Sequence, residues 1–133
     1  MNFSTNRYPS KWAILSIGLF VFLIACKETR TLEVTATAYN SLESQTKKGD
    51  PTTAAWGDQL KPGMKAIAVS RDLIPEGLDH KTKVKIEGLN GTYVVLDKMN
   101  KRWKKKIDIY MGVDVTKARE WGKRKVNIEW QVD

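Results

Sequence analysis

The feature that most constrains the fold is a series of short segments that are rich in strand-forming residues and separated by turn residues. A strand places successive side chains on opposite faces, so alternation of apolar and polar residues predicts a strand with one buried face. Within residues 82–89, Val84 and Ile86 alternate with Lys83 and Lys85. The same pattern, or a short apolar run, predicts five further strands: residues 31–39, 66–70, 92–97, 107–111 and 125–130.

The remaining local signals predict one helix and one hairpin. The helix is expected at residues 114–122, because Asp114 is a good N-cap residue and Gly122 suits the position after the last helical residue. Asn90–Gly91 lies between two predicted strands and favours a tight hairpin that joins antiparallel strands. Six short strands, one short helix and long loops predict a mainly β fold, a small closed barrel, because closure removes exposed strand edges.

The N-terminal part of the chain has the composition of an export signal. Arg7 and Lys11 precede an apolar stretch at residues 12–26. A membrane-spanning helix needs about 20 apolar residues, whereas a secretory signal peptide has a shorter apolar region behind positive charges. The stretch ends in Leu-Ile-Ala-Cys, which resembles a bacterial lipobox and implies cleavage before Cys26 and attachment of lipid to its thiol. The alternative is an uncleaved N-terminal anchor, and both place the rest of the chain outside the cytoplasm.

The expected organisation is a signal peptide at residues 1–25, a lipidated tether at residues 26–31 and one barrel domain at residues 32–133. Cys26 is the single cysteine, and lipidation accounts for a thiol without a disulfide partner. A disulfide and a cysteine-based metal site are therefore excluded. Neither a metal nor a cofactor is expected, because His80 is the single histidine.

The chain is basic, with a formal charge of +8. Residues 1–25 contain two cations, Arg7 and Lys11, and no acids, so their removal leaves a formal charge of +6. A basic protein outside the cytoplasm is not expected to bind nucleic acid. Screened electrostatic attraction acts over about 8 Å, so anionic envelope polymers and lipid headgroups are the expected partners.

Two acids at either end of a strongly cationic connection are the candidate site residues. Asp97 ends one predicted strand. Alternation within residues 107–111 directs the isoleucines to the core, so Asp108 faces outward beside Lys106 and Tyr110. Neighbouring strands lie about 4.8 Å apart, so the two carboxylates can meet in one cleft. The alternative is that Asp97 caps a turn and Asp108 pairs with Lys106.

Five fragments occur in the order and spacing of a known family. They are VTATAYN, AVSRDLIPEG, YVVLDKMN, KIDIYMG and AREWGKRKVNI, and together they extend over roughly residues 31–130. In these fragments the chain resembles the 3D domain, which is named for three aspartates. That family is a double-psi β-barrel related to the catalytic barrel of MltA-type lytic transglycosylases. The resemblance implies a six-stranded double-psi β-barrel that acts on peptidoglycan.

The acids of the family map onto this sequence only in part. The resemblance places one family acid on Asp108 and the acid that ends the preceding strand on Asp97. The first family aspartate falls on Ser70, with Asp72 two positions later, so a mechanism with three carboxylates is not implied. The glycine-rich connection of the family is replaced by residues 98–106, which contain six Lys or Arg residues and Trp103.

The resemblance implies cleavage of the MurNAc–GlcNAc bond without hydrolysis, with the C6 hydroxyl of the sugar as nucleophile. One carboxylic acid suffices, because it protonates the leaving oxygen and then accepts the hydroxyl proton. Asp108 is the expected general acid and base, and Asp97 is its partner. The residues expected to contact substrate are Thr37, Tyr39, Trp103, Lys106 and Tyr110. A Lys106 ammonium beside Asp108 would oppose proton donation by stabilising the carboxylate.

Two other functions are compatible with the sequence. Expansin-type double-psi barrels resemble this scaffold and act on polysaccharide without clear hydrolysis. In such a binding module, the cationic segment 98–106 would bind glycan carboxylates and Trp103 would stack on sugar rings. A structural lipoprotein that bridges the membrane and the wall is the third candidate.

Overall fold

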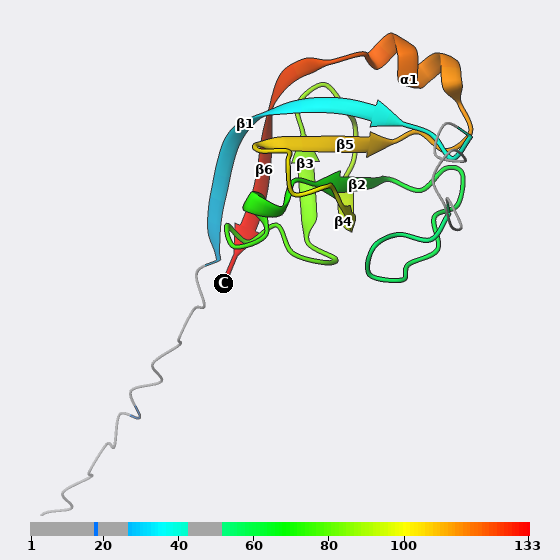
Figure 1. Ribbon diagram of the computed structural model, residues 1–133. Helices are drawn as coiled ribbons and strands as arrows, with labels where there is room; N and C mark the ends of the chain where they lie inside the picture. The colour runs from blue at the N-terminus through cyan, green and yellow to red at the C-terminus, as the bar shows by residue number, and fades with distance from the viewer. Residues whose placement is uncertain (1–17, 19–26, 43–51) are drawn as a thin grey trace, which may run out of the picture.

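The computed structural model describes Gly18, residues 27–42 and residues 52–133 (Figure 1). The predicted signal peptide and Cys26 lie outside the described residues, so lipidation stays a prediction. Within the described part of the chain, no helix has the length and apolar character needed to cross a bilayer.

Six strands form a closed barrel. They are β1 Glu28–Tyr39, β2 Ala66–Val69, β3 Lys83–Ile86, β4 Tyr93–Lys98, β5 Lys106–Tyr110 and β6 Arg124–Val132. Around the barrel they follow the order β1-β5-β2-β4-β3-β6. The β1–β5 and β2–β4 pairs are parallel and the other pairs are antiparallel. The prediction of a mainly β fold, a closed six-stranded barrel with one short helix, is confirmed; α1, Val115–Trp121, is the one α-helix among the described residues.

The alternating pattern of the sequence places one face of each strand inside the barrel. Every strand contributes at least one side chain with 2% exposure or less: Val34, Ile67, Val84, Val95, Ile107 and Ile128. Burying such a side chain contributes about 1.5–3 kcal/mol, so this interior is the main source of stability. A second, smaller apolar cluster joins β2, β4 and β5 to the loop of residues 52–65, and consists of Ala54, Leu60, Ala66, Leu96 and Tyr110.

Strand β1 begins earlier than predicted. Residues 28–31 were expected to belong to a tether, but β1 starts at Glu28, which pairs with Val132 of β6. The pairing is continuous because β6 also extends beyond its predicted end. In addition, the Arg30 side chain donates a hydrogen bond of 2.9 Å to the carbonyl of Glu76. The polar residues 28–31 are therefore part of the barrel.

The hairpin between β3 and β4 is antiparallel, as predicted, but its turn is not the tight one expected at Asn90–Gly91. Only Lys83 and Val84 of β3 pair with β4. Beyond them β3 stays in register with β6 and separates from β4. The connection therefore extends over residues 87–92.

Helix α1 has the predicted caps and covers one end of the barrel (Figure 1). The Asp114 carboxylate accepts a hydrogen bond of 2.8 Å from the N–H of Lys117. Gly122, with φ of 65°, ends the helix in a conformation that favours glycine. Trp121 is buried, and its indole N–H donates to the carbonyl of Ala36 at 3.4 Å. The caps thus fix a short helix whose apolar face closes the core.

Replacing Asp114 with alanine removes the acceptor for a helix N–H and is expected to lower the free energy of unfolding by about 1 kcal/mol. Asp114→Asn is the matched control, because asparagine keeps an acceptor and is an equally good cap. Urea unfolding followed by tryptophan fluorescence measures both. Equal losses in the two variants would contradict a capping role.

Candidate functional site

Four residues on neighbouring strands form a row across the outer face of the barrel. Thr37 of β1 pairs with Asp108 of β5. Ala68 of β2 pairs with Asp108 on one side and with Asp97 of β4 on the other. Paired residues point to the same side of a sheet. The two predicted acids therefore lie on either side of Ala68 and face outward together.

A bulge in β4 brings Asp97 to this face. Val95 pairs with Ile67, and both lie in the barrel interior. The next residue of β2, Ala68, pairs with Asp97 rather than with Leu96. Leu96 is an extra residue, and a bulge of this kind re-aims the side chains that follow it. In a regular strand Asp97 would point into the apolar interior, where an unpaired carboxylate is strongly disfavoured.

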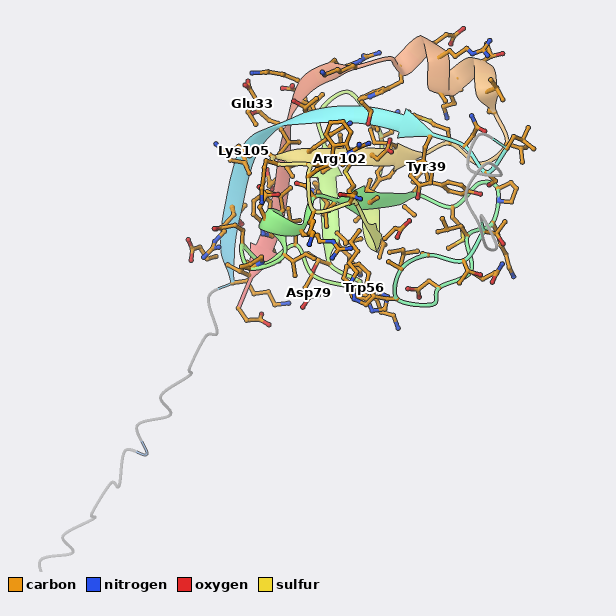
Figure 2. The ribbon with its side chains drawn as sticks, viewed as in Figure 1. Glu33, Tyr39, Trp56, Asp79, Arg102 and Lys105 are labelled. Carbon is orange, nitrogen blue, oxygen red and sulfur yellow. The ribbon has the colours of Figure 1, made fainter. Side chains whose placement is uncertain are left out.

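Three residues of the row, Asp108, Ala68 and Asp97, line a pocket of about 340 Å³. Ala68, 5% exposed, forms its floor, and the two acids, Tyr39 and residues of the loop 98–103 line it. Tyr39 and Arg102, which border the pocket, are labelled in Figure 2. The backbones of the two acids are two strand spacings apart, about 10 Å, so the space above Ala68 is open. Small-molecule sites have volumes of about 300–1,000 Å³, and this pocket is at the lower end of that range.

Hydrogen bonds fix the orientation of both carboxylates. Asp97 Oδ1 accepts from the backbone N–H groups of Ala55, at 2.8 Å, and Lys98, at 2.9 Å. Thr37 Oγ1 donates to Asp108 Oδ1 at 3.0 Å. Because Ala55 belongs to the loop 52–65, that loop positions one of the two acids.

Tyr39 supplies a hydrogen-bond donor next to the carboxylates. Burial raises the pKa of Tyr39, and the negative charges of Asp97 and Asp108 raise it further, so the phenol stays protonated. Its hydroxyl is buried and has no hydrogen-bond partner among the described residues. Its ring packs against that of Tyr110, with centroids 5.4 Å apart. A protonated hydroxyl in this position can donate to a ligand in the pocket.

A cationic loop with one exposed aromatic side chain borders the pocket. Trp103, 36% exposed, lines it together with Met99, Asn100 and Arg102. The Arg102 guanidinium lies 4.8 Å from the centroid of the Trp103 ring and the Lys106 ammonium lies 3.7 Å from it. Both contacts are cation–π interactions. Lys106 forms no ion pair with a described residue.

The structure brings most of the predicted site residues together. Asp97, Asp108, Tyr39 and Trp103 line one pocket, Thr37 bonds to Asp108, and Lys106 contacts Trp103. Their roles in binding and catalysis stay predictions.

Tyr110 lies on the outer face of β5 with Lys106 and Asp108, as predicted, but it is buried and does not line the pocket, where it was expected to contact substrate. It is 3% exposed, and its hydroxyl is 2.6 Å from that of Ser41. The outer face of β5 is covered at this point by the loop 52–65, so Tyr110 belongs to the smaller apolar cluster.

Sequence patterns missed several residues that line the pocket. Ala68 was counted only as part of a strand, because its position between the two acids depends on the register of three strands. Asn40, Met99 and Asn100 also line the pocket without a distinguishing signal. Arg102 could have been found from its place beside Trp103 in the cationic segment.

Ser70 and Asp72 do not belong to this pocket and instead secure the start of β5. Ser70 is fully buried, and its hydroxyl accepts a hydrogen bond of 3.0 Å from the N–H of Lys106. Asp72, in the 3-10 helix η2 (Arg71–Leu73), accepts a bond of 3.0 Å from the N–H of Lys105. Burial raises the pKa of Asp72, but the nearby Ser70 hydroxyl and the Lys105 N–H outweigh it, so the pKa lies below its usual value.

Asp72→Asn is expected to lower the free energy of unfolding by about 1 kcal/mol at neutral pH, because a hydrogen bond to a charged acceptor is weakened. A carboxylate with a lowered folded-state pKa stabilises above its unfolded pKa and loses this effect as the pH falls through the folded value. The difference between wild type and Asp72→Asn should therefore shrink below about pH 4. Urea unfolding over a pH series measures it, and a constant difference would contradict the role of the charge. Exposed Glu33→Gln serves as control, with a change below about 0.5 kcal/mol.

His80, the single histidine, contacts two residues of the loop 52–65. Its Nε2 is hydrogen-bonded to a carboxylate oxygen of Asp58, and its ring stacks on Trp56, with centroids 4.9 Å apart. These contacts attach the loop 52–65 to the segment before β3. Among the described residues, no group of three His, Cys, Asp or Glu side chains is placed to hold a metal ion.

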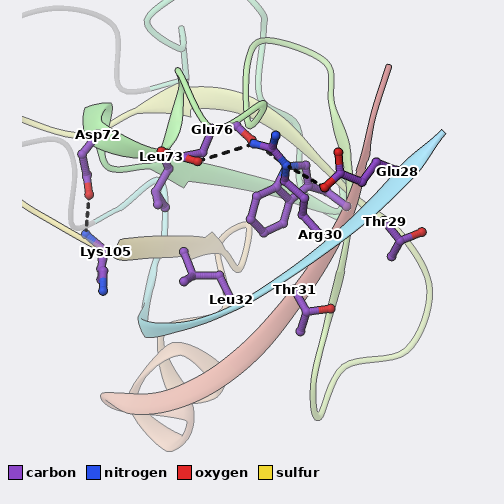
Figure 3. Close-up of a pocket in the computed structure, with 10 residues that line it drawn as sticks. Glu28, Thr29, Arg30, Thr31, Leu32, Asp72, Leu73, Glu76 and Lys105 are labelled. Carbon is purple, nitrogen blue, oxygen red and sulfur yellow. Dashed lines mark hydrogen bonds and ion pairs between the residues drawn. The ribbon is translucent and has the colours of Figure 1, made fainter.

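A larger pocket, of about 790 Å³, lies at the start of β1 (Figure 3). The candidate site lies near the end of β1, where Tyr39 lines it. The Arg30 guanidinium in the larger pocket is 3.4 Å from the Glu76 carboxylate and 3.9 Å from that of Glu28. The Asp72 carboxylate accepts a hydrogen bond from the backbone N–H of Lys105. Because the Arg30 guanidinium and the three carboxylates of this pocket already have partners within the protein, the smaller pocket is the better candidate for a functional site.

No family model and no curated protein matches the sequence. The solved structures that are similar include two of an expansin from Clavibacter michiganensis. The apo expansin aligns with a TM-score of 0.49 and 18% identity, and an aspartate-to-asparagine mutant in complex with cellohexaose aligns with a TM-score of 0.46 and 16% identity. Each alignment covers 78% of this chain and 51% of the expansin chain, so this chain spans about half the length of those proteins. Likeness of this degree assigns no function, and membership of the 3D-domain family stays a prediction.

Proposed function

We propose that the chain is a cell-envelope protein that binds a glycan, with peptidoglycan as the expected one, in the pocket between Asp97 and Asp108. The observation that carries this proposal is the row of Thr37, Asp108, Ala68 and Asp97, in which two oriented carboxylates lie on either side of an open floor. Sugar hydroxyl groups donate to carboxylates and accept from donors such as Tyr39. The pocket therefore offers both kinds of hydrogen-bond partner that a sugar needs.

The cationic loop extends the proposed site beyond the pocket. Trp103 offers a partly exposed ring on which a sugar can stack. Residues 98–106 contain six Lys or Arg residues, which attract the carboxylates of an acidic glycan over about 8 Å at physiological ionic strength. Binding should therefore weaken as salt is raised.

The proposed location is the bacterial cell envelope, outside the cytoplasm. Residues 1–25 would be removed as a signal peptide, and lipid on Cys26 would hold the protein at a membrane. The proposal rests on the lipobox-like sequence Leu23–Cys26. Mass spectrometry of the membrane-extracted protein would detect the lipid, and an unmodified thiol would contradict it.

The binding site is tested by changing the volume of its floor. A protein comprising residues 27–133 keeps every strand of the barrel, and its sedimentation with purified peptidoglycan measures binding. Ala68→Val places two extra methyl groups between the carboxylates and is expected to weaken binding about tenfold or more, since overpacking of this kind costs about 1–3 kcal/mol. Ala68→Gly is the matched control, because it changes the same position but leaves the pocket open. Equal binding by the valine variant and wild type would contradict the proposed site.

A second candidate function is cleavage of the MurNAc–GlcNAc bond with Asp108 as general acid and base. It is favoured by one observation: the Lys106 ammonium lies over the Trp103 ring, 3.7 Å from its centroid, so this cation is engaged by the ring. Asp108 would give its proton to the leaving oxygen as the bond to the anomeric carbon breaks. It would then accept the proton of the C6 hydroxyl, which closes the anhydro ring.

Asp108→Asn distinguishes cleavage from binding alone. Asparagine keeps the size of the side chain but cannot donate and recover the proton. If Asp108 is catalytic, mass spectrometry of peptidoglycan incubated with wild type should show anhydro-muropeptides, and the variant should form about 100-fold fewer. Sedimentation without anhydro products would support binding alone. If wild type gives neither anhydro products nor sedimentation, both glycan functions are contradicted and the structural lipoprotein is the remaining candidate.

A further inference from the structure

The barrel carries a second charged surface, which the proposed glycan site does not use. Four lysines, Lys27, Lys81, Lys83 and Lys85, line a groove of about 590 Å³. We call this surface the lysine face. Lys83 and Lys85 alternate along β3 with buried Val84 and Ile86, so both ammonium groups point away from the core.

The ammonium groups of the lysine face have no ion-pair partners among the described residues. Two acids, Glu129 and Asp133, also line the groove, so the lysines exceed the acids by four to two. All four lysines are exposed. Exposed cations that line one groove attract an anionic surface over about a Debye length, roughly 8 Å.

The position of this surface points to a membrane. Lys27 belongs to the lysine face and directly follows Cys26, the proposed lipid attachment site. Because β1 begins at Glu28, no tether separates the barrel from that cysteine. A lipid on Cys26 would therefore bring the lysine face within a few ångströms of the headgroups.

The candidate glycan site lies on the other side of the barrel. In the barrel order β1-β5-β2-β4-β3-β6, the row of Thr37, Asp108, Ala68 and Asp97 extends over the first four strands and is centred on β5 and β2. The lysine face is lined from β3 and β6, the two remaining strands. β5, which carries Asp108, passes in front of β3 in the view of Figure 1. A membrane in contact with the lysine face would leave the pocket above Ala68 open on the opposite side.

We propose that the lysine face docks on the anionic headgroups of a phospholipid bilayer and holds the barrel with its Asp97–Asp108 pocket directed away from the membrane. The docking surface itself does not depend on the proposed glycan function. It supplements a lipid anchor by fixing the orientation of a barrel that has no spacer.

Vesicle sedimentation tests the docking surface without the lipid anchor. The protein of residues 27–133 should bind vesicles of phosphatidylcholine and phosphatidylglycerol, and should not bind vesicles of phosphatidylcholine alone. The variant Lys81→Gln/Lys83→Gln/Lys85→Gln is expected to bind the anionic vesicles about 100-fold more weakly, since each lysine near such a surface contributes about a fivefold effect. Thermal unfolding should show that this variant is folded, because the three side chains are exposed.

The matched control is Lys61→Gln/Lys117→Gln/Lys123→Gln, which removes the same charge from exposed positions outside the lysine face. It should keep at least most of the vesicle binding. Equal losses in the two triple variants would show that only net charge matters and would overturn the proposal. Peptidoglycan sedimentation should be unchanged in both variants, so a failure of docking and a failure of glycan binding are distinguishable.

The orientation is tested with single fluorescent labels, because the protein of residues 27–133 contains no cysteine. A polarity-sensitive probe on Thr92→Cys, in the lysine-lined groove, should shift its emission when anionic vesicles are added. The same probe on Lys101→Cys, in the cationic loop near the pocket, should not. A larger response from the Lys101→Cys probe would show that the glycan side faces the bilayer and would overturn the proposal.

Discussion

The bulge at Leu96 links the barrel interior to the candidate site on its outer face. Val95 fills the interior, while both Leu96 and Asp97 lie outside it. Leu96 packs with residues of the loop 52–65, and this contact holds the loop against the barrel. The loop in turn donates the Ala55 N–H that orients Asp97. One irregular residue thus exposes a carboxylate, anchors a loop beside it and fixes the direction of the carboxylate, without loss of the apolar core.

The strands and the outward direction of Asp108 could be predicted, because the physical signal lies within each segment. The alternation of apolar and polar residues in segments 82–89 and 107–111 predicts which side chains are buried, and a capping residue such as Asp114 predicts where a helix begins. The position of Asp97 opposite Ala68 could not be predicted in the same way. It depends on the register between strands and on a bulge, and the apolar segment before Asp97 gives no sign of an extra residue. The burial of Tyr110 was missed because a distant loop covers it.

The start of β1 was missed for a related reason. Residues 28–31 are polar and have no apolar alternation of their own, so nothing within them indicates a strand. They are ordered by pairing with β6, in which backbone hydrogen bonds do not depend on apolar side chains. This pairing makes residues 28–31 part of the folded barrel and not a tether. A lipidated chain would have no flexible spacer, and the distance of the pocket from the membrane would be set by the barrel itself.

The contact between Lys106 and Trp103 connects the two parts of the proposed glycan site. The ammonium lies 3.7 Å from the ring centroid, so it covers part of one face of the ring. A sugar that stacks on that face must displace the ammonium, which costs the cation–π interaction, about 0.5–1 kcal/mol at an exposed site. A neutral sugar gives nothing in return. A glycan with a carboxylate offers the displaced ammonium a new partner and so recovers part of this cost. A neutral glycan therefore stacks on Trp103 less favourably than an acidic glycan does. In the proposed site, the exchange of Lys106 between the Trp103 ring and a glycan carboxylate would therefore favour acidic glycans over neutral ones.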